Sequence, residues 1–286
     1  MYLRMFGLTP ALAAAMIGMY VVMGIVEWFL PAEKGHSWAG RFRNFTYTLI
    51  YLGVGTLLLN QLLRVLPNLQ KYVQQHDYPI LIAVIYLVVF DFFYYWYHRA
   101  QHRWSLLWRI HELHHSDTEL NITTSLRTHW LEKPVQQCLV MLPTVLVVGV
   151  DIAALYWTAI IGQLWEMATH ANVRWHLPRM ADVVCNPGVH RVHHSRLKEH
   201  HHCNFAQFLT VYDMIFGTYI APDRKVLPPT GTDTVASDYS VIGNMFRPFL
   251  PRRSAGGEGE PVPSVVTARA GRGRRRKKKR RKSPTR

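Results

Sequence analysis

The chain has 286 residues, 49% of them hydrophobic, and a formal charge of +15. The apolar residues are clustered in long runs, which indicates a membrane protein, and twelve of the Lys and Arg residues lie in the segment 269–286. The three cysteines, Cys138, Cys185 and Cys203, are widely spaced and form no C-x-x-C pair. This pattern argues against a disulfide framework, a structural zinc finger and an iron–sulfur cluster.

Three apolar runs predict membrane-spanning helices. The first, Pro10–Leu30, contains Glu27 as its only charge and is long enough for about 30 Å of helix, the thickness of one bilayer core. A secretory signal is the alternative for this run, but the run is too long and no small-residue cleavage site follows it. The other two predicted spans are Phe45–Leu66 and Tyr78–Tyr97, the last of which carries Asp91.

The distribution of basic residues between these runs predicts their orientation. The segment 31–44 holds three Lys or Arg residues, whereas 67–77 holds only one. The region after the third run opens with Arg99, Arg103 and Arg109. Since cytoplasmic loops are enriched in Lys and Arg, we expect the N-terminus outside and the region after Tyr97 in the cytoplasm.

A fourth apolar stretch, Cys138–Trp165, predicts a helical hairpin that turns at Gly149–Asp151. Its arms of about 14 residues are short for a crossing, so we expect a tilted or re-entrant hairpin. The histidines that precede and follow it can then lie on the same side of the membrane.

We therefore expect an all-α integral membrane protein with three spanning helices, a short hairpin and a histidine-rich helical cap on the cytoplasmic face. Residues 1–77 would hold the first two spans, and 78–222 the catalytic domain, including the helix 78–97 and the hairpin 134–168. Residues 223–250 would form a C-terminal extension. The segment 251–286 is too polar and basic to form a core, which predicts a disordered tail.

Eight histidines fall into three blocks with helical spacing. Residues three or four apart share one face of a helix, so each block can direct its imidazoles into one pocket. Eight nitrogen ligands are too many for one ion, but divided over two ions they leave coordination positions for O2 or substrate, which favours two irons. A dinuclear zinc hydrolase stays open. The blocks are His98 and His102; His111, His114 and His115; and His190, His193 and His194.

The second block also contains the H-E-x-x-H pattern of zinc proteases, in which Glu112 would act as general base between His111 and His115. An intramembrane zinc metalloprotease is therefore the alternative hypothesis. It needs only two histidines and one further ligand, so it leaves the first and third blocks without a role.

The histidine blocks, together with Asn204-Phe205 and Tyr212-Asp213, resemble the fatty acid hydroxylase and sterol desaturase superfamily over roughly residues 90–220. The resemblance implies a membrane-bound, non-haem di-iron enzyme that uses O2 to hydroxylate or desaturate a fatty acyl, sterol or related lipid. It implies that the eight histidines are catalytic metal ligands and that His170 is a further ligand. The family commonly has Trp-Asp where this chain has Tyr212-Asp213.

Two further residues are expected to support the ligands. Asp91 precedes His98 by seven residues and lies on the same helical face, so its carboxylate could fix a ligand imidazole; a carboxylate that reaches the membrane surface is the alternative. Asn204 is assigned a supporting role by the resemblance.

The expected partners are a lipid substrate, the membrane and a separate electron-transfer protein, since no donor domain is fused to the chain. The basic tail is expected to bind anionic lipid rather than nucleic acid. We expect Trp96, Trp130, Trp157 and Trp165 to anchor the helices at the membrane surface. The alternative is that they line a cleft through which the lipid enters from the bilayer.

Overall fold

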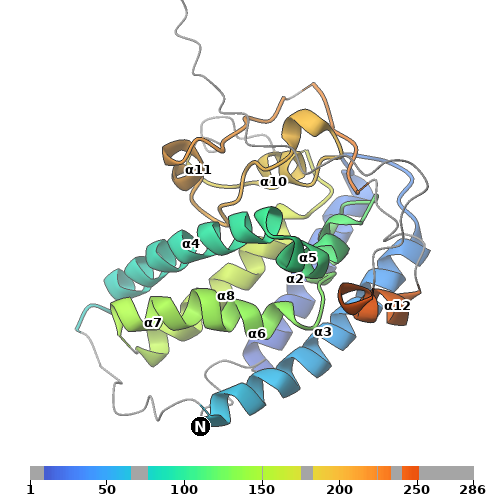
Figure 1. Cartoon of the computed structure of the whole chain (residues 1–286). Coiled ribbons are helices and arrows are strands. Elements are labelled where there is room, and N and C mark those ends of the chain that lie inside the picture. The colour runs from blue at the N-terminus through green and yellow to red at the C-terminus, as the bar shows by residue number, and fades with distance from the viewer. Residues whose placement is uncertain are drawn as a thin grey trace, which may run out of the picture. The chain divides into compact units, whose positions relative to one another are not determined.

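The computed structural model describes residues 10–65, 77–149, 151–174, 183–223, 225–232 and 240–250. All regular elements in these ranges are helices, with three isolated β-bridges and no strand (Figure 1). The predicted all-α class is therefore confirmed. The chain divides into two units, Met1–Pro251 and Arg252–Arg286, and the predicted disordered tail lies outside the described residues.

Three long helices correspond to the three predicted spans: α2 (Pro10–Phe29), α3 (Trp38–Val65) and α4 (Pro79–Arg103). Among the described residues, α2 and α4 are long and apolar enough to cross a membrane. The helix α3 begins before the predicted run and includes Arg41 and Arg43, which lowers its hydropathy. The crossing by α3 therefore stays a prediction.

The predicted hairpin forms, and its turn lies at the predicted place. One arm consists of α6 (Glu132–Gln136), a π-helical turn η3 (Gln137–Met141) and α7 (Leu142–Val148). The other arm is α8 (Ile152–Thr169), whose first turn is capped by Asp151 Oδ1, which accepts from the Ala154 N–H at 2.9 Å. Gly149 ends α7 with a φ of +97°, a conformation that only glycine adopts readily.

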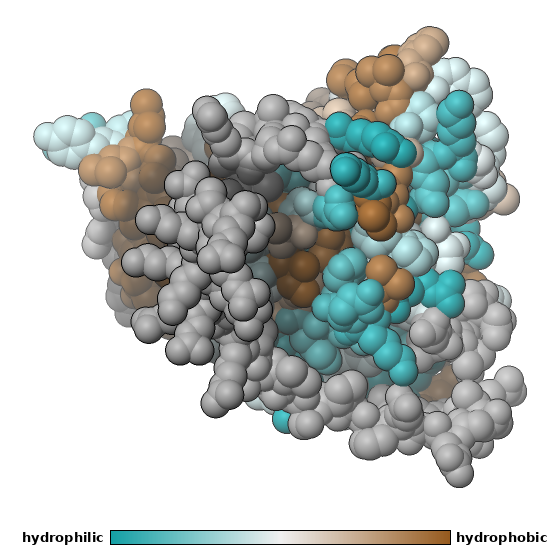
Figure 2. All heavy atoms as spheres, turned by 90° about the horizontal axis from the view of Figure 1, so that it is seen from above, coloured by the Kyte–Doolittle hydropathy of each residue, from teal (hydrophilic) through white to brown (hydrophobic). Residues whose placement is uncertain are grey.

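Around α4 the elements are arranged in two groups. The hairpin helices α7 and α8 pack against one side of α4. The short helices α10 (Pro187–His193) and α11 (Val211–Ile215) lie on its other side, as Figure 1 shows. Seen from above, the side of α10 and α11, hydrophilic residues gather in the right half of the visible face, and hydrophobic residues lie at its upper left and upper right (Figure 2).

A second set of short elements completes the cap. The helix α5 (Ser105–His115) follows α4 directly and packs against it. The other elements are η2 (Ile122–Leu126), η4 (Lys198–His200), α12 (Val241–Phe246) and η6 (Arg247–Phe249).

Glu27, the only charge in the first apolar run, joins α2 to three other parts of the chain. The residue is 3% exposed. Its carboxylate accepts a hydrogen bond from Arg41 Nη1 at 2.7 Å and from the backbone N–H groups of Ile122 and Asn172, each at 2.7 Å. One buried carboxylate thus fixes α2 against α3, η2 and the segment after α8.

Arg127 holds the C-terminal end of α5, where two histidines of the second block lie. Its buried guanidinium donates to the Leu113 carbonyl at 3.1 Å, to Ser116 Oγ at 2.8 Å and to Asn44 Oδ1 at 2.8 Å. A cation at a helix C-terminus compensates carbonyl groups that have no partner within the helix. The orientation of α5 is therefore fixed relative to α3.

We predict that Glu27→Leu destabilises the protein by about 3–5 kcal/mol, because it leaves Arg41 and two backbone N–H groups without their acceptor. The measurement is the thermal unfolding midpoint of the full chain in detergent micelles. The control is Val21→Ala at an exposed position of the same helix, which should leave the midpoint nearly unchanged. Equal midpoints for the two variants would contradict the role of Glu27.

Candidate metal centre

All nine histidines predicted as ligands lie in two adjacent groups. Within each group, one ligand nitrogen from each ring lies within 4.8 Å of all the others. Either group could hold a metal ion. The five-histidine group consists of His98, His102, His111, His115 and His193, and the four-histidine group of His114, His170, His190 and His194.

The helical spacing explains how three sequence blocks serve two groups. Neighbouring residues on a helix point about 100° apart. On α5, His115 therefore joins His111 in the five-histidine group, whereas His114 faces the four-histidine group. In the same way, α10 and its cap residue divide the third block, with His193 in the first group and His194 in the second. In each pair of consecutive histidines, one residue thus belongs to the five-histidine group and the other to the four-histidine group.

Hydrogen bonds at Nδ1 orient four of the rings. His98 donates to the Phe205 carbonyl at 2.8 Å, and His193 to the Cys203 carbonyl at 2.7 Å. His170 donates to the Glu166 carbonyl at 2.6 Å, and His111 to the Glu132 carboxylate at 3.2 Å. Because these oxygens can only accept, the proton is on Nδ1 and the lone pair of each ring is on Nε2.

The Nε2 atoms of His98 and His111 lie 3.1 Å apart. Both nitrogens carry lone pairs in this tautomer, so neither can donate to the other. Two nitrogens that each lie about 2.1 Å from one ion, at an angle of about 95°, are about 3.1 Å apart. The separation therefore fits a shared cation.

The four-histidine group has the same short separations. His170 Nε2 lies 3.0 Å from the Nε2 atoms of both His114 and His190. Among the described residues, the buried Nε2 atoms of His102 and His193 in the other group have no hydrogen-bond partner. Buried polar atoms without partners are rare, and a metal ion would satisfy them. The donor set thus fits two metal ions.

Burial keeps six of the nine histidines, all of them outside the spanning helices, neutral at neutral pH, because it lowers the pKa of each. Burial lowers the pKa of His170 to about 4 and that of His193 to about 3. Neutral imidazole is the form that binds metal ions. Burial, followed by the neighbouring imidazoles, also lowers the pKa well below its usual value for His114, His115, His190 and His194.

Glu132 is a site residue that the sequence analysis missed. Its buried carboxylate accepts from His111 Nδ1 and, at 3.1 Å, from Gln101 Nε2. A carboxylate on the second nitrogen of a metal-binding imidazole is a common arrangement in metalloproteins. The signal in the sequence is that Glu132 ends the segment 127–132, which lies between the second histidine block and the hairpin. None of the predicted metal ligands lies in this segment.

Asp91 has different hydrogen-bond partners from the predicted imidazole. Its fully buried carboxylate accepts from the backbone N–H groups of Gln207, Phe208 and Leu209 at 2.6–3.1 Å, instead of holding an imidazole. These bonds fix the loop whose Phe205 carbonyl orients His98. Asp91 therefore supports the site through the loop, since it lies seven residues, or about 10.5 Å of helix, before His98.

Asn204 lies between the two carbonyl groups that orient His193 and His98. Its side chain donates to the Val189 carbonyl at 3.1 Å and to the Ile220 carbonyl at 2.9 Å, and its φ is +54°. Asparagine tolerates this left-handed conformation better than most residues. Asn204 thereby holds the turn that presents the carbonyls of Cys203 and Phe205.

The H-E-x-x-H glutamate is directed to another part of the chain. The buried Glu112 forms an ion pair with Arg247 of η6 at 2.8 Å. His111 and His115 share their group with three further histidines, rather than with the single additional ligand of a zinc protease. The metalloprotease hypothesis is therefore not supported.

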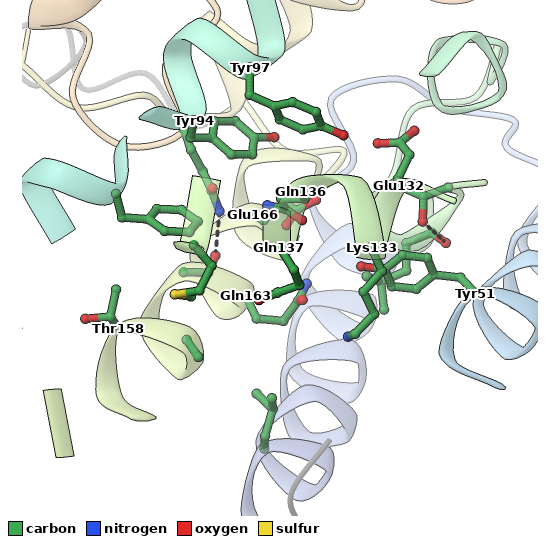
Figure 3. A pocket seen from close by; sticks show the side chains of 18 of the residues that line it. Tyr51, Tyr94, Tyr97, Glu132, Lys133, Gln136, Gln137, Thr158, Gln163 and Glu166 are labelled. Carbon is green, nitrogen blue, oxygen red and sulfur yellow. Dashed lines mark hydrogen bonds between the residues drawn. The ribbon is translucent and has the colours of Figure 1, made fainter. Parts of the chain in front are cut away.

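A cavity of about 140 Å³ reaches His111 and His114, one from each group. It is enclosed by α2, α3, α4, α8 and the α6–η3 segment (Figure 3). The four tryptophans of the alternative entry cleft do not line this cavity. Trp96 and Trp157 are instead 42% and 55% exposed, as expected for residues at a membrane surface.

Comparison with known proteins shows which protein family the histidine-containing part of the chain is similar to. Residues 83–218, which include all three histidine blocks and His170, match the sequence profile described as fatty acid hydroxylase. Ornithine lipid hydroxylase OlsE of Rhizobium tropici is 26% identical over 245 residues, which cover 80% of this chain and 70% of that protein. No solved structure matches significantly.

Two other relatives match only a part of their length. Human alkylglycerol monooxygenase is 34% identical over 145 residues, and a very-long-chain aldehyde decarbonylase of Oryza sativa is 27% identical over 149 residues. These matches cover 48% and 49% of this chain. They cover 30% of the monooxygenase and 23% of the decarbonylase. The profile match covers all nine histidines of the two groups, so residues 83–218 are similar to the fatty acid hydroxylase family.

Proposed function

We propose that this protein is a multi-pass membrane enzyme that uses O2 and a non-haem di-iron centre to hydroxylate or desaturate a lipid. The main support is the pair of histidine groups, and above all the two Nε2 lone pairs of His98 and His111 that face each other at 3.1 Å. The relatives include a lipid hydroxylase and alkylglycerol monooxygenases, and their names support a lipid substrate for this chain.

In this proposal the nine histidines are the metal ligands. Two irons bound here would supply O2 activation and the one-electron steps, with electrons from a separate donor protein. The protein holds the rings through the oxygen atoms at Nδ1, and Glu132 increases the basicity of His111. Burial of both groups keeps water away from the reacting C–H bond.

The proposed membrane arrangement follows from the apolar helices and the basic residues. Arg99, Arg103 and Arg109 follow or end the apolar part of α4 and would lie at the cytoplasmic surface. The cavity between α4, α8 and the α6–η3 segment would then receive a lipid from the bilayer. The metal centre would face the cytoplasm, where soluble electron donors are available.

The decisive experiment is an isotope measurement on the purified, iron-loaded full chain with a lipid extract and a chemical or enzymatic reductant. We predict that ¹⁸O from ¹⁸O2 appears in a hydroxylated lipid, or that a desaturated lipid forms with consumption of O2, and that neither product forms without O2. Product formation under anaerobic conditions, with ¹⁸O incorporated from water, would indicate a hydrolase and contradict the proposal.

We predict that the two histidine groups bind separate ions. The unaltered protein should contain about two irons per chain, whereas His102→Ala and His194→Ala, which alter different groups, should each bind about one and lose at least about 100-fold in turnover, because a group that loses one ligand loses its ion. Metal analysis of the purified variants measures this. His201→Ala changes an exposed histidine and should retain two irons. Two irons in all three variants would contradict the assignment.

We predict that Glu132→Leu weakens iron binding by about 10–100-fold, because His111 loses the carboxylate that fixes its tautomer and orientation. The affinity can be measured by competition with a chelator. Glu199→Leu makes the same change at an exposed position of the cap and serves as the control. An unchanged affinity in Glu132→Leu would show that this carboxylate has no role in the site.

A further inference from the structure

The cavity beside the histidines changes from polar to apolar along its length, and each of its walls shows the same order. On α8, Glu166 precedes His170 by four residues and lies about 6 Å from it along the helix axis. Gln163 and Thr158 follow on the same face, and Leu155 is about 22 Å from His170. This wall is therefore polar near the histidines and apolar far from them.

The α6–η3 wall has the same order. It begins with Glu132, which is bonded to His111, and continues with Lys133, Gln136 and Gln137. It ends with the apolar Met141. Figure 3 shows the side chains of this wall beside those of Gln163 and Glu166 from α8.

The α4 wall repeats the pattern. Tyr97 and Tyr94 line the cavity next to His98, and Phe90 lines it one further turn away. Leu12 and Met16 of α2 add further apolar lining, as do Leu52 of α3, Leu126 of η2 and Ala159 of α8. Three separate elements thus place hydrogen-bonding side chains at the histidine end and hydrocarbon side chains at the other.

Several polar atoms of this lining have no hydrogen-bond partner among the described residues. They are Gln163 Nε2, Thr158 Oγ1 and Gln207 Oε1, all of which are buried. Thr158 and Gln207 are 4% and 9% exposed. Buried polar atoms are normally paired, so these atoms indicate an occupant that forms hydrogen bonds. A plain hydrocarbon chain would leave all three without partners.

We infer that the cavity binds an amphipathic lipid whose hydroxyl or amine group lies next to the histidines, so that the oxidised carbon is in or directly beside the polar group. The inference rests on the proposed function only in taking the histidines as the reaction centre. Glu132 and Glu166 lie in the lining against one cation, Lys133, which favours groups that donate hydrogen bonds over anionic groups. Gln163 and Gln207 are the residues that determine this specificity, because Thr158 lies about 18 Å from His170 along α8.

The test is a binding measurement with the full chain in neutral detergent micelles. We expect 1-O-hexadecylglycerol and hexadecylamine to bind at least about tenfold more tightly than hexadecane, because each hydrogen bond to a buried partner contributes a factor of this order. Hexadecanoate should gain no such advantage, since its carboxylate would lie beside two glutamates.

Two substitutions assign the preference to the cavity. Gln163→Leu and Gln207→Leu should each reduce the preference for 1-O-hexadecylglycerol by about three- to tenfold and leave the affinity for hexadecane unchanged. The matched control is Leu155→Ala at the apolar end, which should weaken both probes by the same factor. Equal affinities for hexadecane, hexadecanoate and 1-O-hexadecylglycerol would overturn the inference, as would an equal effect of Gln163→Leu on both probes.

The binding assay needs neither O2 nor a reductant, so its result is separate from that of the isotope experiment. A preference for the hydroxylated probe without any O2-dependent product would sink the proposed function and leave this inference standing. Oxidation in the middle of a hydrocarbon chain, without that preference, would sink the inference and leave the proposed function standing.

Discussion

The metal centre depends on the hydrogen bonds that hold Nδ1 of four histidine rings. These rings are His98, His111, His170 and His193. A histidine ring that rotates freely has two possible donor atoms, whereas a ring bonded at Nδ1 presents one lone pair in one direction. The carbonyl groups of Phe205 and Cys203 provide this constraint for His98 and His193, and Glu132 provides it for His111. The positions of these three acceptors therefore determine the geometry of the five-histidine group, and the Glu166 carbonyl holds His170 of the four-histidine group in the same way.

Two of these acceptors lie in a segment without regular secondary structure, so their positions have to be fixed by side chains. Asp91 binds three consecutive N–H groups just after the segment, and Asp213 accepts from the N–H groups of Phe205 at 2.7 Å and Ala206 at 3.0 Å. Buried carboxylates that accept several backbone hydrogen bonds form strong, charge-assisted contacts. An irregular loop is thereby held as firmly as the helices that carry the histidines.

The polar cavity is connected to the same interactions. Glu132 lines the cavity and also orients His111, and Gln207 lines it next to residues that Asp91 holds. The side chains that contact a substrate are therefore attached directly to those that position the rings. In the proposed function, this arrangement would place a bound lipid at a defined distance from both histidine groups, as attack on one particular C–H bond requires.

The sequence by itself determined the helical class, the turn at Gly149 and the eight histidines of the three blocks, because these features follow from local spacing and from the conformation of single residues. His170 was indicated only by the family resemblance. The sequence could not assign the histidines to two groups, because the contacts between His98 and His193, or between His114 and His170, join parts of the chain that are far apart. The same holds for the partners of Asp91 and Glu132 and for the cavity lining. Only the tertiary structure decided these, since they depend on how α4, α5, α8 and α10 pack against one another.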